Sequence, residues 1–328
     1  MAQTNGNAGL TLTMLGCGTL GTSILSGILD SLSDLRSSQP PHSGIITGTS
    51  TPAEEVPAHL PNHFIACVRR HESAKRVAAQ LSQYKNQLTI CEDNNLAGAQ
   101  AGDIVILGCK PYGVAEILQA EGIKKALEGK LLISICAGVP VEQIDDILYP
   151  GQSHAEIIKA GGCTVVRAMP NTASKVRESM TVIATSTPPL QPQQSSLVTW
   201  IFTRIGRVVH LPPSMMDIST ALCGSGPAFM ALVLEAIADG AVAMGLPRAE
   251  AQTMAAQTMR GTTGLVLDGE HPAILRDKVS TPGGCTIGGL LVLEEGRVRG
   301  TLARAVREAC VVASQLGKGV QGVNGTRF

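Results

Sequence analysis

The alternation of short apolar runs with helical stretches, which continues to about residue 212, is the feature that most constrains the fold of this 328-residue chain. Near-continuous apolar runs are typical of strands that are covered on both faces. Stretches with helical periodicity separate these runs, as at 18–32 and 72–83. The alternation predicts an α/β domain with a Rossmann-like, doubly wound and mostly parallel sheet. The expected strands are 10–15, 63–68, 103–109, 130–137, 164–169, 179–185 and 207–211.

The character of the sequence changes after 212–217, which reads PPSMMD. We therefore divide the chain into an α/β domain at 1–212 and an all-α domain at 213–328. The stretch 227–246 is apolar nearly all round, so we expect it to be buried. A domain this small cannot bury it alone, and a second copy of the chain is the natural partner. The other expected helices are 247–269 and 297–316.

One stretch interrupts the strand–helix alternation. Residues 36–62 are rich in Ser, Pro, Gly and Thr. This composition is typical of loops, and we expect a surface insertion between the first helix and the second strand.

Charge and composition exclude several classes of function. Lysine plus arginine equals aspartate plus glutamate at 26 each, and aromatic residues make up only 2%. Neither a basic nucleic-acid footprint nor a base-stacking platform is therefore expected, nor is a membrane-surface patch. The seven histidines show no metal-ligand spacing, so we predict no metal site.

The cysteines and the N-terminal sequence bear on the compartment. The nine cysteines form no CxxC pair, which favours reduced thiols, mostly as small core residues. The first ten residues, MAQTNGNAGL, lack the basic and apolar regions of a signal peptide. We found no apolar run of the about 18 residues needed to cross a bilayer. We therefore expect a cytoplasmic protein.

A glycine-rich motif stands between the first expected strand and the first expected helix. Its glycines allow a tight turn and let a pyrophosphate approach the helix N-terminus, where free N–H groups and the helix dipole favour anions. The motif predicts dinucleotide binding, and the alternative is a purely structural glycine turn. It consists of Gly16, Cys17, Gly18, Thr19, Leu20 and Gly21.

The second expected strand ends in Arg69 and Arg70. Two guanidinium groups at this place suit the 2′-phosphate of NADP, although a solvated basic turn is the simpler alternative. Glu72 could instead serve the ribose of NAD. We favour NADPH as the cofactor and keep NADH as a possibility.

Two further strands end in small residues, which leave room for a nicotinamide ribose beyond the carboxyl edge of the sheet. Lys110 could contact the cofactor or a substrate carboxylate, or be an ordinary exposed lysine. The segment 167–172 ends another strand, and we expect it to form a further wall of the site. The predicted cofactor contacts at the two strand ends are Cys109, Lys110, Pro111, Cys136, Ala137 and Gly138.

Taken together, the motifs resemble those of the pyrroline-5-carboxylate reductases, and the resemblance covers nearly the whole chain. The most specific stretch is 279–294, VSTPGGCTIGGLLVLE. The family implies an N-terminal dinucleotide-binding domain and a C-terminal helical domain that dimerises and binds substrate, with dimers often assembling into rings of five. The other matching stretches are 16–21, 109–111, 136–139, 169–172, 223–228 and 244–247.

The resemblance also implies roles for single residues. Asn95 matches an asparagine at the adenosine ribose of the cofactor, and Lys278 matches a position near the cofactor. Thr286 matches the threonine that holds the substrate carboxylate, beside the backbone amides of Gly284 and Cys285. We assign the catalytic role to Thr286 and Lys110.

The stretch 279–294 supports this assignment by its own chemistry. Bare glycine amides at a helix start, with a threonine hydroxyl, form a site for a small anion. The structural alternative is a helix–helix crossing at which glycines let two backbones approach. With the carboxylate held there, the imine carbon of the substrate faces the nicotinamide, and hydride transfer from NADPH gives L-proline.

A cyclic imine that binds protonated is already electrophilic, so positioning accounts for most of the expected catalysis. This agrees with the lack of a His–Asp or Lys–Tyr pair in the sequence. Two other functions remain open at this point. One is a two-domain dehydrogenase of the 3-hydroxyacid type, and the other is a non-catalytic NADP-sensing dimer.

Overall fold

The computed structural model describes residues 9–36, 57–317, 320 and 326. Most of the predicted insertion, residues 37–56, lies outside the described residues. Its two ends differ from the prediction, because the first helix reaches Arg36 and the second strand begins at Pro61.

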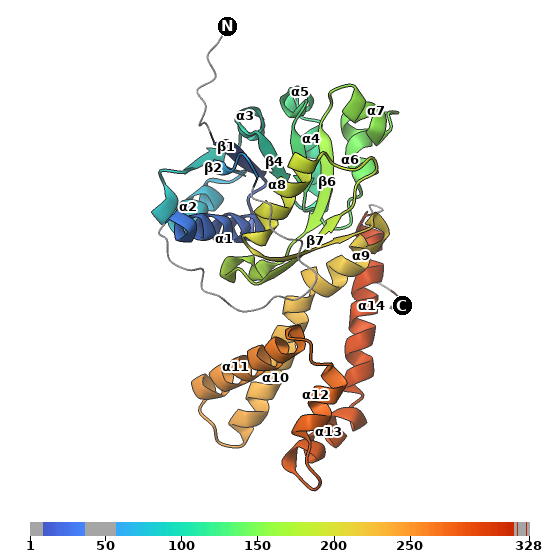
Figure 1. Ribbon diagram of the computed structural model, residues 1–328. Coiled ribbons are helices and arrows are strands. Elements are labelled where there is room, and N and C mark those ends of the chain that lie inside the picture. Colours follow the sequence, from blue (N-terminus) through green and yellow to red (C-terminus); the bar gives the residue numbers. More distant parts are fainter. Residues whose placement is uncertain (1–8, 37–56, 318–319, 321–325, 327–328) are drawn as a thin grey trace.

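The N-terminal part contains eight strands with helices between them (Figure 1). The strands are β1 (Leu10–Leu15), β2 (Pro61–Val68), β3 (Leu88–Glu92), β4 (Ile104–Leu107), β5 (Leu131–Ser134), β6 (Thr164–Met169), β7 (Ser179–Ala184) and β8 (Gly206–Leu211). The helices are α1 (Thr19–Arg36), α2 (His71–Gln80), α3 (Asn95–Ala101), α4 (Val114–Leu118), α5 (Ile123–Leu127), α6 (Val141–Leu148), α7 (His154–Lys159) and α8 (Pro192–Thr203), with 3₁₀ turns at Ser82–Tyr84, Pro111–Gly113 and Thr172–Val176.

The strands form one sheet in the order β3-β2-β1-β4-β5-β6-β7-β8. Pairing is parallel from β3 through to β6, which confirms the predicted doubly wound sheet. The sheet reverses at β7, which pairs antiparallel with the end of β6, Ala168 opposite Ile183 and Met169 opposite Val182. Strand β8 then runs parallel to β7.

Alternation along the strands divides the core into two layers. In β1, Leu12 and Met14 face a layer closed by α1, α2 and α8, in which Trp200 and Phe202 are buried. Leu15 faces the opposite layer, which is closed by helices of the α3–α7 segment. Because helices cover both faces, the carboxyl edge of the parallel strands is the natural opening for a ligand.

The C-terminal part is helical, as predicted, and extends from the sheet as an arm (Figure 1). Its elements are a 3₁₀ turn (Pro213–Met215), α9 (Met216–Ser219), a π turn (Thr220–Gly224), α10 (Gly226–Ala243), α11 (Arg248–Leu267), α12 (Pro272–Val279), α13 (Cys285–Glu295) and α14 (Val298–Gly317). Helix α14 returns to the sheet domain, where its last turn lies against Gly138.

Helix α10 is not buried within a single copy of the chain, and its burial was expected only against a second copy. Ala238 is its buried residue, whereas Met230, Leu232 and Ile237 are exposed. The continuous run Pro213–Ala243 also has the length and composition of a bilayer-crossing helix, with 11% of its most apolar window buried. We had expected no such segment. A partner surface for the arm is the alternative explanation of the same apolar faces.

Candidate active site

The glycine loop lies at the carboxyl end of β1 and opens α1. Gly16 has φ +77°, and a Cβ there would lie 2.9 Å from the Cα and Cβ of Cys109. Gly21 packs against the strand, because a Cβ at this position would meet Met14 Cγ at 3.2 Å. A side chain at Gly16 would therefore clash with the end of β4, and one at Gly21 would require Met14 to shift.

Gly18 differs from these two glycines. A Cβ at Gly18 would have only the Gly16 carbonyl oxygen near it, at 4.0 Å, so open space lies above this residue. The first intrahelical bond of α1 runs from Thr22 N–H to Gly18 O at 2.9 Å. The N–H groups of Thr19, Leu20 and Gly21 precede that bond and face the open end of the helix. Open space and unused amides at the same place fit a bound phosphate.

Arg69 and Arg70 are both exposed just beyond β2. Arg69 forms an ion pair with Glu116 at 3.8 Å. Because both side chains are largely exposed to solvent, this ion pair holds Arg69 only weakly. Arg70 precedes α2 as its N-cap without a side-chain cap bond. Both guanidinium groups can therefore turn toward an anion at this edge.

Asn94, rather than Asn95, caps α3. Its side chain accepts a hydrogen bond from Ala97 N–H at 2.9 Å. The half-buried Asn95 follows as the first residue of the helix, so its amide is not needed for the cap. The predicted ribose-binding residue thus keeps its side chain for another partner.

The ends of β4 and β5 bring most of the other predicted cofactor contacts together. Cys109 lies opposite Cys136, with their Sγ atoms 3.9 Å apart. Lys110 is exposed, and Pro111 begins the next 3₁₀ turn. Ala137 is half-buried beside the small cluster of Met169 and Met216. These residues line the same carboxyl edge as the glycine loop, as the parallel sheet requires.

Gly138 joins the two parts of the chain. It has φ +73°, and a Cβ would lie 2.7 Å from Ala313 O and 2.8 Å from Gly317 N. The last turn of α14 therefore covers the β5–α6 turn by backbone contact. A side chain at Gly138 would push the helical arm away from the carboxyl edge of the sheet.

Two buried polar residues near this junction belong to the segment 167–172, which was predicted as a further wall of the site, although neither was named as a cofactor contact. Arg167 is 6% exposed, and one of its terminal nitrogens has no hydrogen-bond partner among the described residues. Burial lowers the pKa of its guanidinium, which the charges of Asp217 and Glu142 oppose. Asn171 donates through Nδ2 to Cys223 O at 3.0 Å and so ties the end of β6 to the arm. The sequence predicted a wall at 167–172, but the apolar run of β6 gave no sign that the Arg167 side chain is buried.

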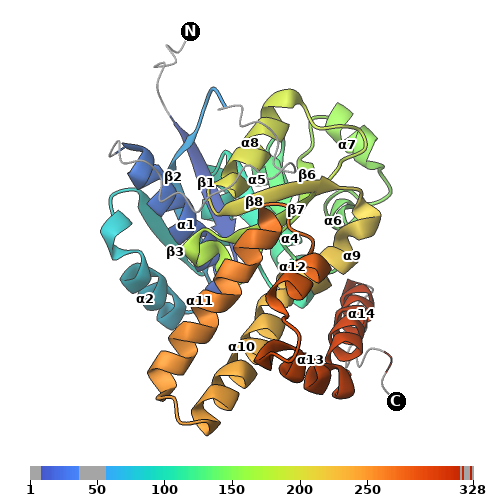
Figure 2. The same ribbon diagram turned by 60° about the horizontal axis from the view of Figure 1, so that its bottom comes forward.

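The segment around Thr286 lies at the start of α13, in the arm. Gly284 is the N-cap of this helix, Cys285 is exposed and Thr286 is half-buried. Gly283 has φ +71° with open space around it, so the loop is not packed shut. Figures 1 and 2 both place α13 away from the glycine loop of the same chain.

Lys278 lies on α12, close to this segment in the sequence. Its Nζ donates to both carboxylate oxygens of Glu270, at 2.7 and 2.8 Å. Within one chain, Lys278 and the Thr286 segment therefore belong to the arm, and the other predicted site residues belong to the sheet edge.

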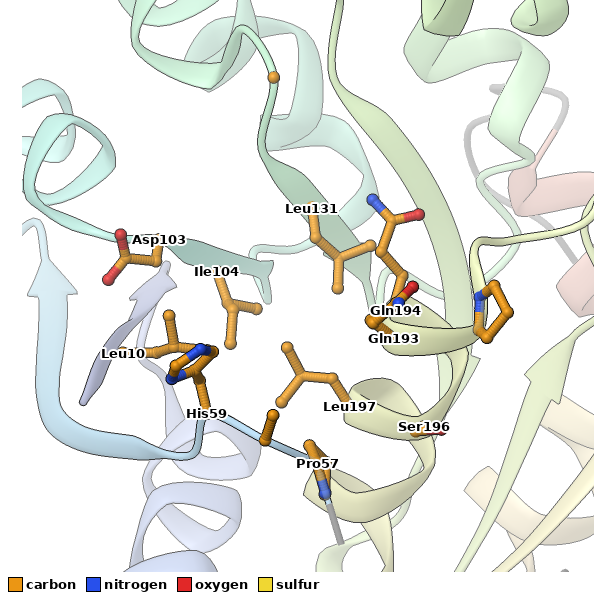
Figure 3. Close-up of a pocket in the computed structure, with 13 residues that line it drawn as sticks. Leu10, Pro57, His59, Asp103, Ile104, Leu131, Gln193, Gln194, Ser196 and Leu197 are labelled. Atoms are coloured by element: carbon orange, nitrogen blue, oxygen red, sulfur yellow. The ribbon is translucent and has the colours of Figure 1, made fainter. Parts of the chain in front are cut away.

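A separate hollow of about 490 Å³ lies at the opposite edge of the sheet (Figure 3). Its floor includes the first residues of three strands, Leu10, Ile104 and Leu131, and Leu197 of α8 forms a wall. The amino edge of a parallel sheet is not where such folds bind nucleotides. The hollow is therefore distinct from the candidate site.

Comparison with known proteins decides the family. Residues 213–316 match the model of the pyrroline-5-carboxylate reductase dimerisation domain, and residues 11–138 match that of the coenzyme F420-dependent NADP oxidoreductases. The chain is 63% identical to a pyrroline-5-carboxylate reductase of Lophium arboricola over 97% of each chain. It is 54% identical to the Neurospora crassa enzyme, over 99% of this chain and 98% of that one.

The chain belongs to the pyrroline-5-carboxylate reductase family. This confirms the resemblance that the motifs indicated.

Solved structures of the family share the fold. The Plasmodium falciparum pyrroline carboxylate reductase, with NADP bound, aligns with a TM-score of 0.71 at 24% identity, over 94% of this chain and 98% of that one. A 1-pyrroline-5-carboxylate reductase of Streptococcus pyogenes aligns with a TM-score of 0.67 at 22% identity, over 94% and 99%. At these identities the likeness shows the architecture, a Rossmann-like domain followed by a helical dimerisation domain.

Metal-ligating residues do not gather in the described ranges 9–36 and 57–317. No group of three His, Cys, Asp or Glu side chains there could hold a metal ion. The candidate site thus consists of backbone amides, small residues, exposed cations and a threonine hydroxyl.

Proposed function

We propose that this chain catalyses the NADPH-dependent reduction of 1-pyrroline-5-carboxylate to L-proline, the last step of proline biosynthesis. The likeness to pyrroline-5-carboxylate reductases over nearly the full length carries the proposal. The open glycine loop and the glycine–threonine helix start are the two anion sites that this reaction requires.

The sheet edge would bind the cofactor. The amides of Thr19, Leu20 and Gly21 take the pyrophosphate at the start of α1. Arg69 and Arg70 take the 2′-phosphate, which makes NADPH the favoured cofactor over NADH. The other proposed contacts at this edge are Gly16, Cys17, Gly18, Asn95, Cys109, Lys110, Pro111, Cys136, Ala137 and Gly138. Lys278, on the arm, is a further proposed contact.

The helical arm would bind the substrate. The amides of Gly284 and Cys285 and the hydroxyl of Thr286 hold the carboxylate at the N-terminus of α13, where the helix dipole adds to the attraction. Because α13 and the glycine loop are apart within one chain, the arm of one protomer completes the site at the cofactor edge of its partner. This explains why the family carries a dimerisation domain.

When bound, NADPH supplies the hydride that reduces the C=N carbon. The chain's own residues position the two molecules: Thr286 fixes the carboxylate, and Lys110 stands at the edge of the nicotinamide subsite. Positioning of this kind can lower a barrier by about 7–11 kcal/mol. A substrate that binds as the protonated imine needs no strong general acid.

A direct assay tests the proposed function. The purified full-length protein is mixed with racemic 1-pyrroline-5-carboxylate and either NADPH or NADH, and oxidation of the cofactor is followed by absorbance while proline is quantified by chromatography. We expect proline in proportion to NADPH consumed, and a higher kcat/KM for NADPH than for NADH. Cofactor binding without turnover would instead support a sensor, and turnover of a 3-hydroxyacid with NADP⁺ would support a dehydrogenase.

The assembly and the compartment belong to the same proposal. Exposed apolar faces on α10 and α13 support a homodimer, and the family resemblance extends this to a pentamer of dimers. Free cysteines throughout the described residues support a reducing compartment, the cytoplasm. The domain division at 212/213 completes the proposal, with dinucleotide binding before it and dimerisation and substrate binding after it.

A further inference from the structure

Cysteines gather at the carboxyl edge of the sheet. They occupy the ends of five neighbouring strands in the order β3, β2, β1, β4 and β5, and all are free thiols. The sequence scatters them over about a hundred and twenty residues, so only the parallel topology brings them to one edge. These cysteines are Cys91, Cys67, Cys17, Cys109 and Cys136.

Cys109 and Cys136 have a geometry that is close to that of a disulfide. Leu107 pairs with Ser134 in the ladder between β4 and β5, and Ile135 N–H continues it to Leu107 O at 3.0 Å. The same register places Cys109 opposite Cys136. Neighbouring strands lie about 4.8 Å apart, within the about 4.4–6.8 Å between Cα atoms that a disulfide spans. The Sγ atoms, now 3.9 Å apart, must close to about 2.05 Å by side-chain rotation together with a small shift of the two strand ends.

The two thiols differ in a way that suits oxidation. Cys109 is half-buried at the open edge, whereas Cys136 is buried. The Cys136 thiol donates to two backbone carbonyl oxygens, with Sγ 3.3 Å from Cys109 O and 3.4 Å from Leu107 O. A hydrogen bond from Cys136 lowers the pKa of the Cys109 thiol, although burial opposes the shift. The same pairing, with burial, raises the pKa of Cys136. Cys109 is thus the thiolate that reacts first, and Cys136 is the thiol held next to it.

We propose that Cys109 and Cys136 form a reversible disulfide when the protein meets a hydroperoxide, and that this bond shuts the cofactor edge. The Cys109 thiolate attacks a peroxide oxygen, giving a sulfenic acid and hydroxide from hydrogen peroxide. The Cys136 sulfur then attacks the sulfenic sulfur, and water leaves. Two thiols lose two electrons in total, and one peroxide becomes two waters. A dithiol reductant restores both thiols.

The bond would act on cofactor binding through Gly16. A Cβ at Gly16 would already lie 2.9 Å from the backbone and Cβ of Cys109, so the glycine loop and the end of β4 fit tightly. A shift of Cys109 toward β5 would change the contact between the glycine loop and the end of β4. A displacement of about 1 Å at a binding site can cost about a hundredfold in rate. This inference rests on the proposed function, because it takes the edge to be the NADPH site.

Another cysteine pair is less suited to the same chemistry. Cys67 and Cys91 are register partners on β2 and β3. Burial raises the pKa of Cys67, which is packed so closely under α3 that a Cβ at Gly98 would lie 2.2 Å from its Sγ. A side chain held in this way cannot rotate freely, and its thiol stays protonated. Cys91 is therefore the matched control position.

The experiment uses the full-length protein, reduced and then treated with hydrogen peroxide. Non-reducing peptide mapping by mass spectrometry should find the Cys109–Cys136 link, and NADPH turnover should fall by more than about tenfold and return with dithiothreitol. Cys109→Val and Cys136→Ser, each compared with its own reduced state, should lose the response. Cys91→Ser and Cys285→Ala should keep it.

The outcomes separate the two proposals. A different disulfide, or none at a peroxide dose that lowers turnover, overturns the inference. So does a Cys109–Cys136 link that leaves NADPH turnover and binding unchanged. A reduced protein that forms no proline overturns the proposed function instead, whatever the peptide map shows.

Discussion

The sheet domain and the helical arm bury their apolar residues to very different extents. In the sheet domain, Phe64, Ile106 and Phe202 have no exposed surface, and two layers of helices close the core. In the arm, α12 and α13 have no buried residue, and Leu232 and Val292 are each 66% exposed. The difference shows that one part of the chain folds against itself, whereas the other part leaves apolar faces that the proposed dimer would cover.

A charge introduced on the arm should have the largest effect, because it would act on the proposed contact between two copies. Leu232→Asp places a carboxylate on the apolar face of α10. If a partner buries that face, the unpaired charge costs about 3–5 kcal/mol, which weakens the dimer by more than a hundredfold. Analytical ultracentrifugation should show monomers, and turnover should fall in parallel.

Val176→Asp is the control for this change, because Val176 is 67% exposed but lies on the sheet domain. It should leave the assembly unchanged. If the two variants behave alike, α10 is an ordinary solvent-facing helix.

A cavity in the sheet domain should have the next largest effect, but on stability alone. Phe64→Ala removes a fully buried ring from β2 and should lower the free energy of unfolding by about 3–5 kcal/mol. Denaturant unfolding followed by circular dichroism measures the change, and the association state should be that of the unaltered protein. Tyr112→Ala, at an 88% exposed position, should change stability by less than about 0.5 kcal/mol.

Two substitutions should divide the binding functions between the regions. Thr286→Ala should remove the proposed hydrogen bond to the substrate carboxylate, worth about 1.5–3 kcal/mol, and raise the KM for the imine about tenfold or more. The KM for NADPH should stay nearly constant. Arg70→Ala should do the opposite, with the rise seen for NADPH and not for NADH. Steady-state kinetics in which either variant alters both constants equally would contradict the division.

The smallest expected effect lies at the junction of the two regions. Gly138→Ala and Gly129→Ala both place a side chain at positive φ, +73° and +69°, which costs about 1–2 kcal/mol. Only Gly138 faces backbone of α14, since Gly129 has nothing within 4 Å. Gly138→Ala should therefore be the less stable variant in thermal unfolding. Equal melting temperatures would mean that α14 does not hold the arm in place.

Much of the fold could be predicted from the sequence because continuous apolar runs mark central strands. The runs of β1 and β6 gave their bounds correctly. Strand β3 escaped notice because it is an edge strand of only five residues, LTICE, without a buried run. The reversed direction of β7 was also missed, since an apolar run does not reveal which way a strand points.

The candidate site could also be predicted only where a local sequence pattern marked it. The glycine loop was visible because glycine has few other reasons to recur between a strand and a helix. Arg167 was predicted only as part of the wall at 167–172, because a single cation inside TVVRAM does not by itself indicate a buried side chain. The cysteine pair was also beyond sequence reasoning, since only the register of β4 and β5 makes residues 109 and 136 neighbours.

The position of the arm at the end of the chain has a consequence for biosynthesis. During translation the sheet domain can close its core while the ribosome is still adding the last hundred residues, because domains fold as they emerge. The exposed apolar faces of α10 and α13 appear later, when the sheet domain has already closed its own core. In the proposed dimer, the step from nascent chain to working enzyme would therefore be bimolecular, and its speed would depend on how many copies of the chain are made nearby.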